Sequence, residues 1–269
     1  MSKTIFITGS STGLGRATAV LFASRGWNVI ATMRNPDAAS DLAVTKGITL
    51  VPLDVTKPEQ IAAAAKQALS LGPVDVVFNN AGYALAGPLE GATDEQITRQ
   101  LDTNLLGVMR TTKAFIPALR ERGAGMFIAT TSIGAHVTFP FMSVYHATKW
   151  ALAGWSESLA FELGKFGIRV KTVAPGHIPT DFAGRSIVYT PNPAYAEISG
   201  KAAAVFNSPE QQTRGSTPEQ IAETVWEAAT DEKDQITYVA GADAKTLVAQ
   251  RKAVGVDAFR KGVAQRYFG

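Results

Sequence analysis

The sequence has 269 residues, and its 46% apolar and 18% charged residues exclude a disordered chain and allow a full hydrophobic core. The net charge of +3 comes from scattered Lys and Arg residues, so we expect no nucleic-acid partner and no basic membrane-binding surface. The absence of cysteine excludes disulfides, thiolate metal sites and a cysteine nucleophile, and it fits a reducing compartment.

In chain order, short apolar runs rich in β-forming residues alternate with helical patterns. Several of these runs are almost continuously apolar, which is typical of parallel strands covered on both faces. The predicted strands are Thr4–Thr8, Asn28–Met33, Thr49–Asp54, Val74–Asn79, Met126–Ser132, Arg169–Ala174 and Ile236–Val239. The alternation predicts an α/β fold, a single doubly wound parallel sheet over residues 1–269 with no internal domain boundary.

Helix starts are indicated at Thr56, Thr93 and Thr217, each of which precedes Glu-Gln-Ile in the style of a capping box. Residues 183–215 interrupt the alternation with several prolines, and we expect an irregular lid over a substrate site there. Residues 243–269 predict one C-terminal helix.

The chain enters its first apolar run directly at residue 4, so we expect no signal peptide and a cytoplasmic location. Residues 123–148 carry no charged side chain and are long enough to cross a membrane. Pro140, three glycines, two histidines and many hydroxyl groups argue against a membrane span, because polar groups are costly in hydrocarbon.

A glycine-rich turn follows the first predicted strand. Gly9, Gly13 and Gly15 have the spacing G-x-x-x-G-x-G, which matches neither G-x-G-x-x-G nor the phosphate loop that needs Gly and Lys at its end. Glycines at such a turn let backbone N–H groups and the positive end of a helix approach a phosphate. A purely structural turn is the alternative.

Polar or turn residues follow nearly every other predicted strand. They are Arg34, Asp54, Asn79-Asn80-Ala81-Gly82, Ser132 and Pro175-Gly176. Open α/β sheets bind ligands at the carboxyl ends of their strands, so we expect these residues to share one site.

Tyr145 and Lys149 are four residues apart and share a helix face if residues 143–163 are helical. A nearby ammonium favours the phenolate, so we expect it, together with the positive charge of a bound ligand, to lower the Tyr145 pKa from about 10 towards 7, a change of roughly 4 kcal/mol. The uncharged sequence before Lys149 strengthens this effect. Taken alone, the pair is weak evidence, and a surface Tyr–Lys pair on an amphipathic helix would be the better interpretation.

Several motifs occur in a fixed order: Thr8-Gly9-x-x-x-Gly13-x-Gly15, Asn79-Asn80-Ala81-Gly82, Ser132, Tyr145-x-x-x-Lys149 and Pro175-Gly176. With this combination the chain resembles the short-chain dehydrogenase/reductase family over roughly residues 3–180. Residues 183–269 resemble the family only in general plan. The resemblance implies a Rossmann-type sheet of about seven parallel strands and a nicotinamide dinucleotide cofactor.

The resemblance also implies catalytic roles for four side chains. Ser132 would hydrogen-bond the substrate oxygen, Tyr145 would transfer the proton, and Lys149 would also bind the nicotinamide ribose. Asn104 lies on the buried face of its predicted helix and needs hydrogen-bond partners. The resemblance suggests that Asn104 anchors a water in a proton relay to Lys149, and a structural helix–helix hydrogen bond is the alternative.

The end of the second strand indicates which dinucleotide binds. It has no Asp or Glu for a ribose 2′-hydroxyl, and Arg34 stands where a guanidinium can pair with a 2′-phosphate, so we expect NADP(H). A solvated Arg34 is the alternative. With what the resemblance implies, the expected cofactor-binding residues are Gly9, Ser11, Thr12, Gly13, Leu14, Gly15, Arg34, Asp54, Val55, Asn80, Ala81, Gly82, Tyr145, Lys149, Pro175, Gly176, Ile178 and Thr180.

The expected substrate site lies between the strand ends, the loop after Gly82 and the 183–215 segment. Residues 83–98 and 133–148 contain no Arg or Lys, and the lid has only Arg185, Lys201 and Arg214. We therefore expect a small hydrophobic carbonyl or alcohol as substrate. The expected substrate-binding residues are Tyr83, Phe139, Met142, Phe182 and Tyr189, with Leu85, Val137, Phe141, Tyr195 and Phe206 in the wider lining.

The sequence thus predicts an NADP(H)-dependent oxidoreductase that interconverts a carbonyl and an alcohol by hydride transfer. A non-catalytic NADP(H)-binding sensor is the alternative, although a sensor need not keep Ser132, Tyr145 and Lys149 together. A sugar-nucleotide epimerase or dehydratase would need a different glycine spacing and a larger substrate domain. The histidines at 136, 146 and 177 have no metal-ligand spacing, so no metal is expected, and a homo-oligomer is left open.

Overall fold

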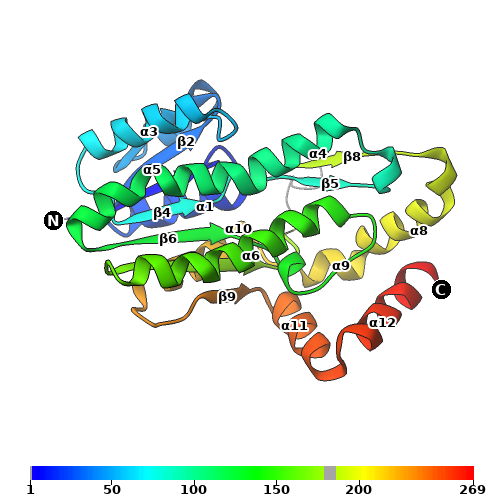
Figure 1. Cartoon of the computed structure of the whole chain (residues 1–269). Coiled ribbons are helices and arrows are strands. Elements are labelled where there is room, and N and C mark those ends of the chain that lie inside the picture. Colours follow the sequence, from blue (N-terminus) through cyan, green and yellow to red (C-terminus); the bar gives the residue numbers. More distant parts are fainter. Residues whose placement is uncertain (1, 179–185) are drawn as a thin grey trace.

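A parallel sheet forms the centre of the computed structural model, which describes residues 2–178 and 186–269 (Figure 1). Its order is β3-β2-β1-β4-β6-β7-β9, and all neighbouring strands run parallel. The strands are β1 (Thr4–Thr8), β2 (Asn28–Met33), β3 (Ile48–Pro52), β4 (Val76–Asn79), β6 (Gly125–Thr130), β7 (Ile168–Pro175) and β9 (Thr237–Ala240). The predicted α/β class with one Rossmann-type sheet is confirmed, and the predicted strand ends differ from the observed ones by at most two residues.

The order of the strands reverses beside β1. The chain runs from β1 outward to β3, and then continues from β4 on the other side of β1 towards β9. In doubly wound sheets this reversal leaves a crevice outside the carboxyl ends of the two central strands. The fold therefore places the glycine turn after β1 and the Asn-Asn-Ala-Gly segment after β4 on either side of one crevice.

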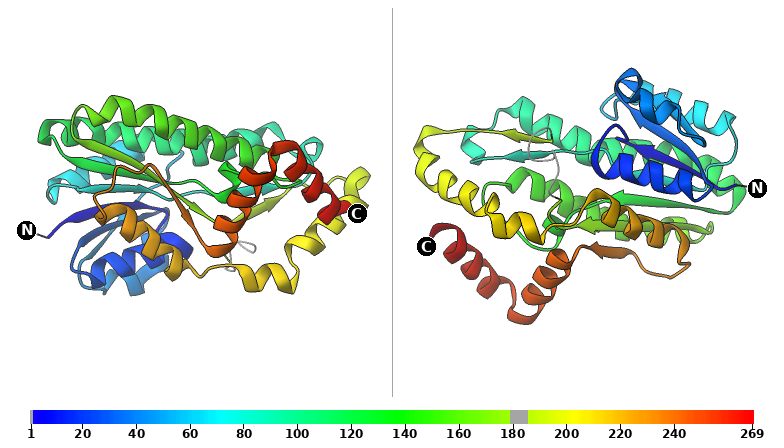
Figure 2. Two further views of the ribbon diagram at one scale, coloured as in Figure 1. Left: turned by 90° about the horizontal axis from the view of Figure 1, so that it is seen from below. Right: turned by 180° about the vertical axis from the view of Figure 1, so that it is seen from behind.

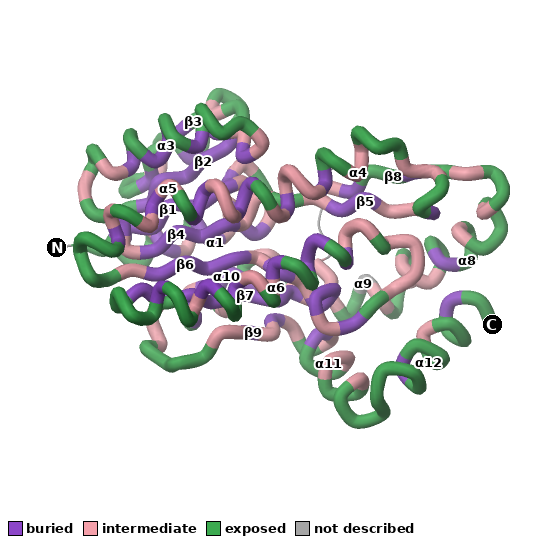
Figure 3. The backbone as a smooth tube through the Cα atoms, viewed as in Figure 1, coloured by how far each residue is buried: buried purple, intermediate pink, exposed green. Residues whose placement is uncertain are grey.

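Helices cover both faces of the sheet (Figure 2). Helices α1 (Gly13–Ser24) and α10 (Pro218–Thr230) lie on one face, and α3 (Pro58–Ser70), α5 (Gly107–Arg122) and α6 (Ser143–Gly164) lie on the other. Alternate residues of β1 enter the two layers: Ile5 packs in the cluster that includes Phe22 of α1, and Phe6 contacts Phe115 of α5. Because both faces are covered, the central strands β1 and β4 are buried along their length (Figure 3), and β1 reads as a nearly continuous apolar run.

The remaining elements lie mostly around the carboxyl edge of the sheet. They are η1 (Pro36–Ala39), α2 (Ser40–Ala43), β5 (Ala84–Ala86), η2 (Leu89–Gly91), α4 (Asp94–Leu101), the π-helical turn η3 (Asp102–Leu106), η4 (Ile133–Ala135), β8 (Ile187–Tyr189), η5 (Pro193–Tyr195), α8 (Ala196–Phe206), α9 (Pro209–Arg214), α11 (Ala242–Val254) and α12 (Val256–Phe268).

Two of the three predicted helix caps are confirmed. Thr93 and Thr217 form complete capping boxes with Gln96 and Gln220 at the starts of α4 and α10. The prediction for Thr56 was wrong. One extra residue separates it from the Glu-Gln pair, so α3 begins at Pro58 and Thr56 instead donates to the Asp54 carboxylate.

The segment 183–215 is more regular than predicted. Its described part contains β8, which pairs in parallel with β5, and the helices α8 and α9. Two of the prolines that suggested irregular structure, Pro193 and Pro209, are the first residues of η5 and α9, where a missing N–H costs nothing. The prediction of an irregular segment was therefore wrong over the described residues.

The C-terminal residues form two helices rather than one. Gly255 has a φ of +81° and separates α11 from α12, because a glycine in this conformation ends the first helix. The chain then returns along α12 towards α8, and the C-terminus lies near that helix (Figure 1). Among the described residues, no helix combines the length and the apolar character that a membrane crossing requires.

Candidate active site

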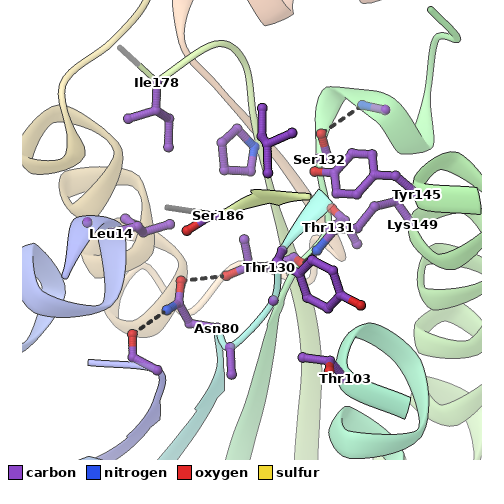
Figure 4. A pocket seen from close by; sticks show the side chains of 18 of the residues that line it. Leu14, Asn80, Thr103, Thr130, Thr131, Ser132, Tyr145, Lys149, Ile178 and Ser186 are labelled. Atoms are coloured by element: carbon purple, nitrogen blue, oxygen red, sulfur yellow. Dashed lines mark hydrogen bonds between the residues drawn. The ribbon is translucent and has the colours of Figure 1, made fainter. Parts of the chain in front are cut away.

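A cavity of about 1400 Å³ opens at the carboxyl edge of the sheet (Figure 4). Residues that follow six of the strands line it. Most of the predicted site residues are in its wall: Gly9, Ser11, Thr12, Gly13, Leu14, Arg34, Asp54, Val55, Asn80, Ala81, Gly82, Ser132, Tyr145, Lys149, Pro175, Gly176 and Ile178. Thr180 lies outside the described residues.

The glycine turn packs tightly against the loop after β4. Gly9 has a φ of +70°, and a β-carbon there would lie 2.9 Å from the Ala81 Cα atom. A β-carbon on Gly15 would lie 2.2 Å from the Gly9 carbonyl oxygen. Gly15 therefore packs against the backbone of the turn, and it is not part of the cavity wall. Gly13, with a φ of +55°, has open space at this position and begins α1.

Asn80 joins the ends of three strands. Its amide nitrogen donates to the carbonyl oxygens of Thr8 and Gly9, both at 3.1 Å, and its amide oxygen accepts from Thr130 Oγ1 at 3.3 Å (Figure 4). Thr8 Oγ1 accepts in turn from the backbone N–H groups of Asn80 and Ala81. This network fixes the glycine turn relative to the strand that leads to Ser132.

Two arginines and one carboxylate lie in the cavity wall on the side of β2 and β3. Arg34 is exposed, and its charge helps to lower the pKa of Asp54 together with hydrogen bonds from Thr56, against the opposing effect of burial. Arg16, in the first turn of α1, forms an ion pair with Asp41. Sequence reasoning had assigned no role to Arg16, which nevertheless lines the same part of the cavity.

Ser132, Tyr145 and Lys149 meet on the opposite side of the cavity (Figure 4). Ser132 caps η4 with its hydroxyl oxygen, which accepts from the Gly134 N–H at 3.0 Å, and the Tyr145 hydroxyl points towards it. Lys149 is 5% exposed, and its Nζ donates to the Thr130 carbonyl oxygen at 2.7 Å. Helix α6 thus carries Tyr145 and Lys149 to the end of β6, where Ser132 follows.

Lys149 alone does not produce the expected fall in the Tyr145 pKa. Burial raises the Tyr145 pKa above its ordinary value, and a side-chain hydrogen bond with Ser132 offsets this only in part. Burial also lowers the Lys149 pKa to about 8. Since the Lys149 ammonium is itself weakened by burial, it does not overcome the cost of placing a phenolate in the same apolar surroundings.

Asn104 is buried in the π-helical turn η3 and does not form part of the cavity wall. Its amide nitrogen donates to the Tyr83 carbonyl oxygen at 2.8 Å and to Thr148 Oγ1 at 3.3 Å, and its amide oxygen accepts from the Tyr83 N–H. The structural hydrogen bond considered as the alternative therefore exists, between η3 and α6. A π-helical turn is often found at functional sites because it redirects a side chain.

Apolar side chains line the end of the cavity beyond Ser132 and Tyr145. Tyr83, Phe139, Met142 and Phe206 lie there as predicted, whereas Phe182 is outside the described residues. The structure does not bring Tyr189 to the cavity: it is 58% exposed, and Ile187 and Val188 of the same strand line the wall instead. Leu85, Val137, Phe141 and Tyr195 are likewise absent from the wall.

The charged residues of this region also differ from the prediction. Lys201 and Arg214 pair with Glu197 and Glu210 on their own helices and do not line the cavity. Arg185 lies outside the described residues. Arg99 of α4, an exposed cation one residue beyond the range 83–98, does line the cavity near Tyr83.

Sequence reasoning missed several side chains of the wall from the C-terminal half, among them Tyr267 and Asp243. Tyr267 of α12 lines the cavity and packs its ring 6.4 Å from that of Phe139. Asp243 of α11 accepts from the His177 N–H at 2.8 Å, in the segment that follows Pro175-Gly176. Asp243 lies just after the carboxyl end of β9, so the rule that found the other strand-end residues could have found it. Tyr267 has no local signal, because it reaches the site only through the return of α12. Within the described ranges, no three His, Asp or Glu side chains gather as a metal site.

A doubly wound parallel sheet with a glycine-lined cavity at its switch point defines a Rossmann-type protein. The family model for short chain dehydrogenases matches residues 3–187. The chain belongs to this family of oxidoreductases.

Individual proteins of known sequence or structure support this assignment. The chain is 35% identical over 250 residues to "Oxidoreductase BOA17" of Botryotinia fuckeliana, which covers 91% of this chain and 90% of the relative. A solved short-chain dehydrogenase from Streptomyces avermitilis superposes with a TM-score of 0.85 at 33% identity, covering 98% of this chain and 95% of that one. A short chain dehydrogenase from Burkholderia cenocepacia, solved in complex with NADP, superposes with a TM-score of 0.77 at 27% identity, covering 100% and 98%.

Proposed function

We propose that this protein is an NADP(H)-dependent oxidoreductase that interconverts a carbonyl and an alcohol on a hydrophobic substrate. The observation that carries the proposal is the convergence of Ser132, Tyr145 and Lys149 on the cavity that the glycine turn also lines. A proton donor, a hydroxyl group and a buried cation beside a dinucleotide-type turn are the groups that carbonyl reduction needs.

The residues present fit a dinucleotide phosphate. Gly13 leaves open space at the start of α1, whose first turn has no acidic residue, so backbone N–H groups can face an anion there. Arg34 is exposed in the same wall and would pair with a 2′-phosphate. The NADP bound by the Burkholderia cenocepacia relative supports this choice. When bound, NADPH supplies the hydride for the carbonyl carbon.

Tyr145 would act as the proton donor to the carbonyl oxygen, and as the acceptor in the reverse direction. Its raised pKa keeps the hydroxyl protonated at neutral pH, which suits donation and therefore reduction. Ser132, next to Tyr145, would hydrogen-bond the same substrate oxygen and fix its position. Lys149 would stabilise the tyrosinate that remains after the proton has left.

Asn104 would complete a proton path behind Lys149. The position of a β-carbon on Gly82 lies 3.2 Å from Asn104 Oδ1 and 3.8 Å from Lys149 Nζ. Because residue 82 is a glycine, no side chain enters the space beside these two groups, and a water that bridges Asn104 Oδ1 and Lys149 Nζ would have room there. We propose that Lys149 passes a proton to the tyrosinate after Tyr145 has reacted, and that such a water then returns a proton from solvent to Lys149.

The substrate class follows from the apolar end of the cavity. Phe139, Met142, Phe206 and Tyr267 present carbon surface there, and Arg99 is an exposed rim residue. Each buried apolar group contributes about 1.5–3 kcal/mol to binding, so hydrophobic bulk would dominate substrate affinity. An aldehyde, ketone or alcohol on an apolar skeleton fits this lining.

The test is NADPH oxidation by the purified protein over a panel of aldehydes, ketones, quinones and steroids. We expect turnover that favours the hydrophobic members. Binding of NADPH without oxidation over the whole panel would overturn the proposal and would favour the non-catalytic sensor.

A further inference from the structure

His146, the residue after Tyr145, is buried on α6 and is hydrogen-bonded to both ends of one loop. The Phe139 N–H donates to its Nε2 at 3.0 Å, and its Nδ1 lies 2.8 Å from the Gly134 carbonyl oxygen. Because a backbone N–H can only donate, Nε2 carries no proton, and the neutral ring donates from Nδ1 to Gly134. One imidazole therefore attaches residues 134–139 to the helix that bears Tyr145.

Gly134 connects His146 to Ser132. Its carbonyl oxygen accepts from His146, while its N–H donates to Ser132 Oγ at 3.0 Å. A β-carbon on residue 134 would lie 3.0 Å from His146 Nδ1 and 3.3 Å from Ser132 Oγ, so a side chain there would push the two apart. Since the Gly134 N–H occupies one lone pair of the hydroxyl oxygen, Ser132 keeps its own hydrogen free to donate into the cavity.

Phe139, at the other end of the loop, belongs to the apolar wall. Its ring lies 6.4 Å from that of Tyr267 and 6.0 Å from that of His146. The hydrogen bond to Nε2 fixes the backbone from which this ring projects. The two nitrogens of His146 thus control different parts of the site, one near the reacting oxygen and one at the substrate skeleton.

We propose that His146 is a positioning residue: through Gly134 its Nδ1 side orients Ser132, and its Nε2 side fixes the Phe139 wall. The proposal rests on the proposed function, in which Ser132 acts on the substrate oxygen. The two nitrogens should therefore have different kinetic effects. Loss of the Nδ1 bond misplaces Ser132 and slows the chemical step, whereas loss of the Nε2 bond displaces Phe139 and weakens substrate binding.

Two conservative variants separate the nitrogens. The amide nitrogen of His146→Asn takes the place of Nδ1 and can still donate to Gly134, whereas the amide oxygen of His146→Gln takes the place of Nε2 and can still accept from Phe139. We expect His146→Asn to raise KM for a hydrophobic carbonyl with kcat within about twofold of wild type, and His146→Gln to lower kcat about tenfold or more with little change in KM. The NADPH dissociation constant, measured by titration without substrate, should stay within about twofold in both variants, because neither side of the ring contacts the glycine turn.

His136→Gln is the matched control, since it changes a histidine of the same loop that does not line the cavity. Hydrogen exchange of the 133–142 peptide adds a readout that needs no turnover: His146→Gln should retain protection of the Phe139 N–H, and His146→Asn should lose it. Equal changes in kcat and KM for both variants, kinetics like wild type in both, or unchanged exchange in His146→Asn would overturn the assignment. Absence of wild-type turnover on every substrate would instead overturn the proposed function, and with it the kinetic role of His146.

Discussion

Lys149 Nζ lies 5.7 Å from the centroid of the Tyr145 ring, one helical turn away on α6. Nζ is held by the Thr130 carbonyl oxygen, a neutral group, so the burial of its charge is not balanced by a carboxylate. Burial lowers the Lys149 pKa to about 8. Lys149 is therefore mostly protonated at neutral pH and begins to lose its charge at mildly alkaline pH. The pair is costly for folding, which is typical of groups kept for function.

The first prediction concerns that cost. The difference between the ordinary pKa of 10.5 and a value of about 8 corresponds to about 3 kcal/mol, reduced by about 1 kcal/mol for the lost bond to Thr130. We expect Lys149→Met to raise the free energy of unfolding by about 2 kcal/mol at pH 7, measured by urea unfolding. Because the folded pKa is depressed, the penalty is fully present below pH 8 and is relieved as the pH rises towards 10.5. A variant that is less stable than wild type at pH 7, or a difference that grows above pH 8, would refute this account.

The second prediction concerns cofactor choice. We expect wild type to bind NADPH more tightly than NADH, and Arg34→Ala to lose most of that preference, since the guanidinium supplies the pairing with the 2′-phosphate. Each dissociation constant is measured by titration. Arg120→Ala, which removes a cation that lies over Phe166 away from the cavity, is the control. Equal affinity of the wild type for both cofactors would show that Arg34 has another role.

The third prediction concerns a buried ion pair remote from the cavity. Lys171 is 1% exposed, and its Nζ donates to Asp231 Oδ1 and to the Tyr238 hydroxyl oxygen, both at 2.8 Å. The bond from Lys171 and a second one, which the Tyr238 hydroxyl donates to Asp231 Oδ2 at 2.7 Å, hold the Asp231 pKa well below its usual range, although burial opposes them. We expect Asp231→Asn to lower the free energy of unfolding by about 3–5 kcal/mol, because it leaves a buried ammonium without a counter-charge.

The pH dependence of this pair has a definite sign. Asp231 has a depressed folded pKa, so its stabilisation is present above the unfolded carboxyl pKa of about 4 and is lost as the pH falls below that value. Wild type should therefore lose its advantage over Asp231→Asn in acid. The exposed neighbour variant Asp234→Asn should stay within about 0.5 kcal/mol of wild type. A loss of similar size in Asp234→Asn would remove the special role of Asp231.

The fourth prediction concerns substrate size. Tyr267 closes part of the apolar end of the cavity against Phe139, so Tyr267→Ala should enlarge it. We expect the ratio of kcat/KM for a bulky ketone to that for a short aldehyde to rise about tenfold, as one pocket contact allows. Phe268→Ala, at a neighbour that does not line the cavity, is the control. An unchanged ratio in Tyr267→Ala would place the substrate elsewhere in the cavity.

The sheet and much of the site were predictable because their signals are local. A strand covered on both faces must be apolar throughout, so β1 and β2 were located to the residue. The glycine turn, Asn80 and Ser132 follow strands directly, and parallel strands bring their carboxyl ends to one edge. Tyr145 and Lys149 needed only the four-residue period of a helix.

What could not be predicted depends on long-range packing. Tyr267 reaches the cavity only because Gly255 reverses the chain between two helices, and no local pattern links it to Phe139. The direction of the Tyr145 pKa depends on how far both it and Lys149 are buried, which composition does not reveal. Tyr189 was assigned to the site by its aromatic character, yet it is the last residue of β8 and is 58% exposed outside the cavity wall.

The measurement that tests the account most directly is turnover by Tyr145→Phe beside its NADPH affinity. The substitution keeps the ring and removes the hydroxyl that lies next to Ser132. We expect NADPH binding within about twofold of wild type and a fall in kcat of at least about a hundredfold with a hydrophobic carbonyl, because the proton donor is gone. Turnover above half of the wild-type value, when chemistry limits the rate, would contradict Tyr145 as the acid and base of this enzyme.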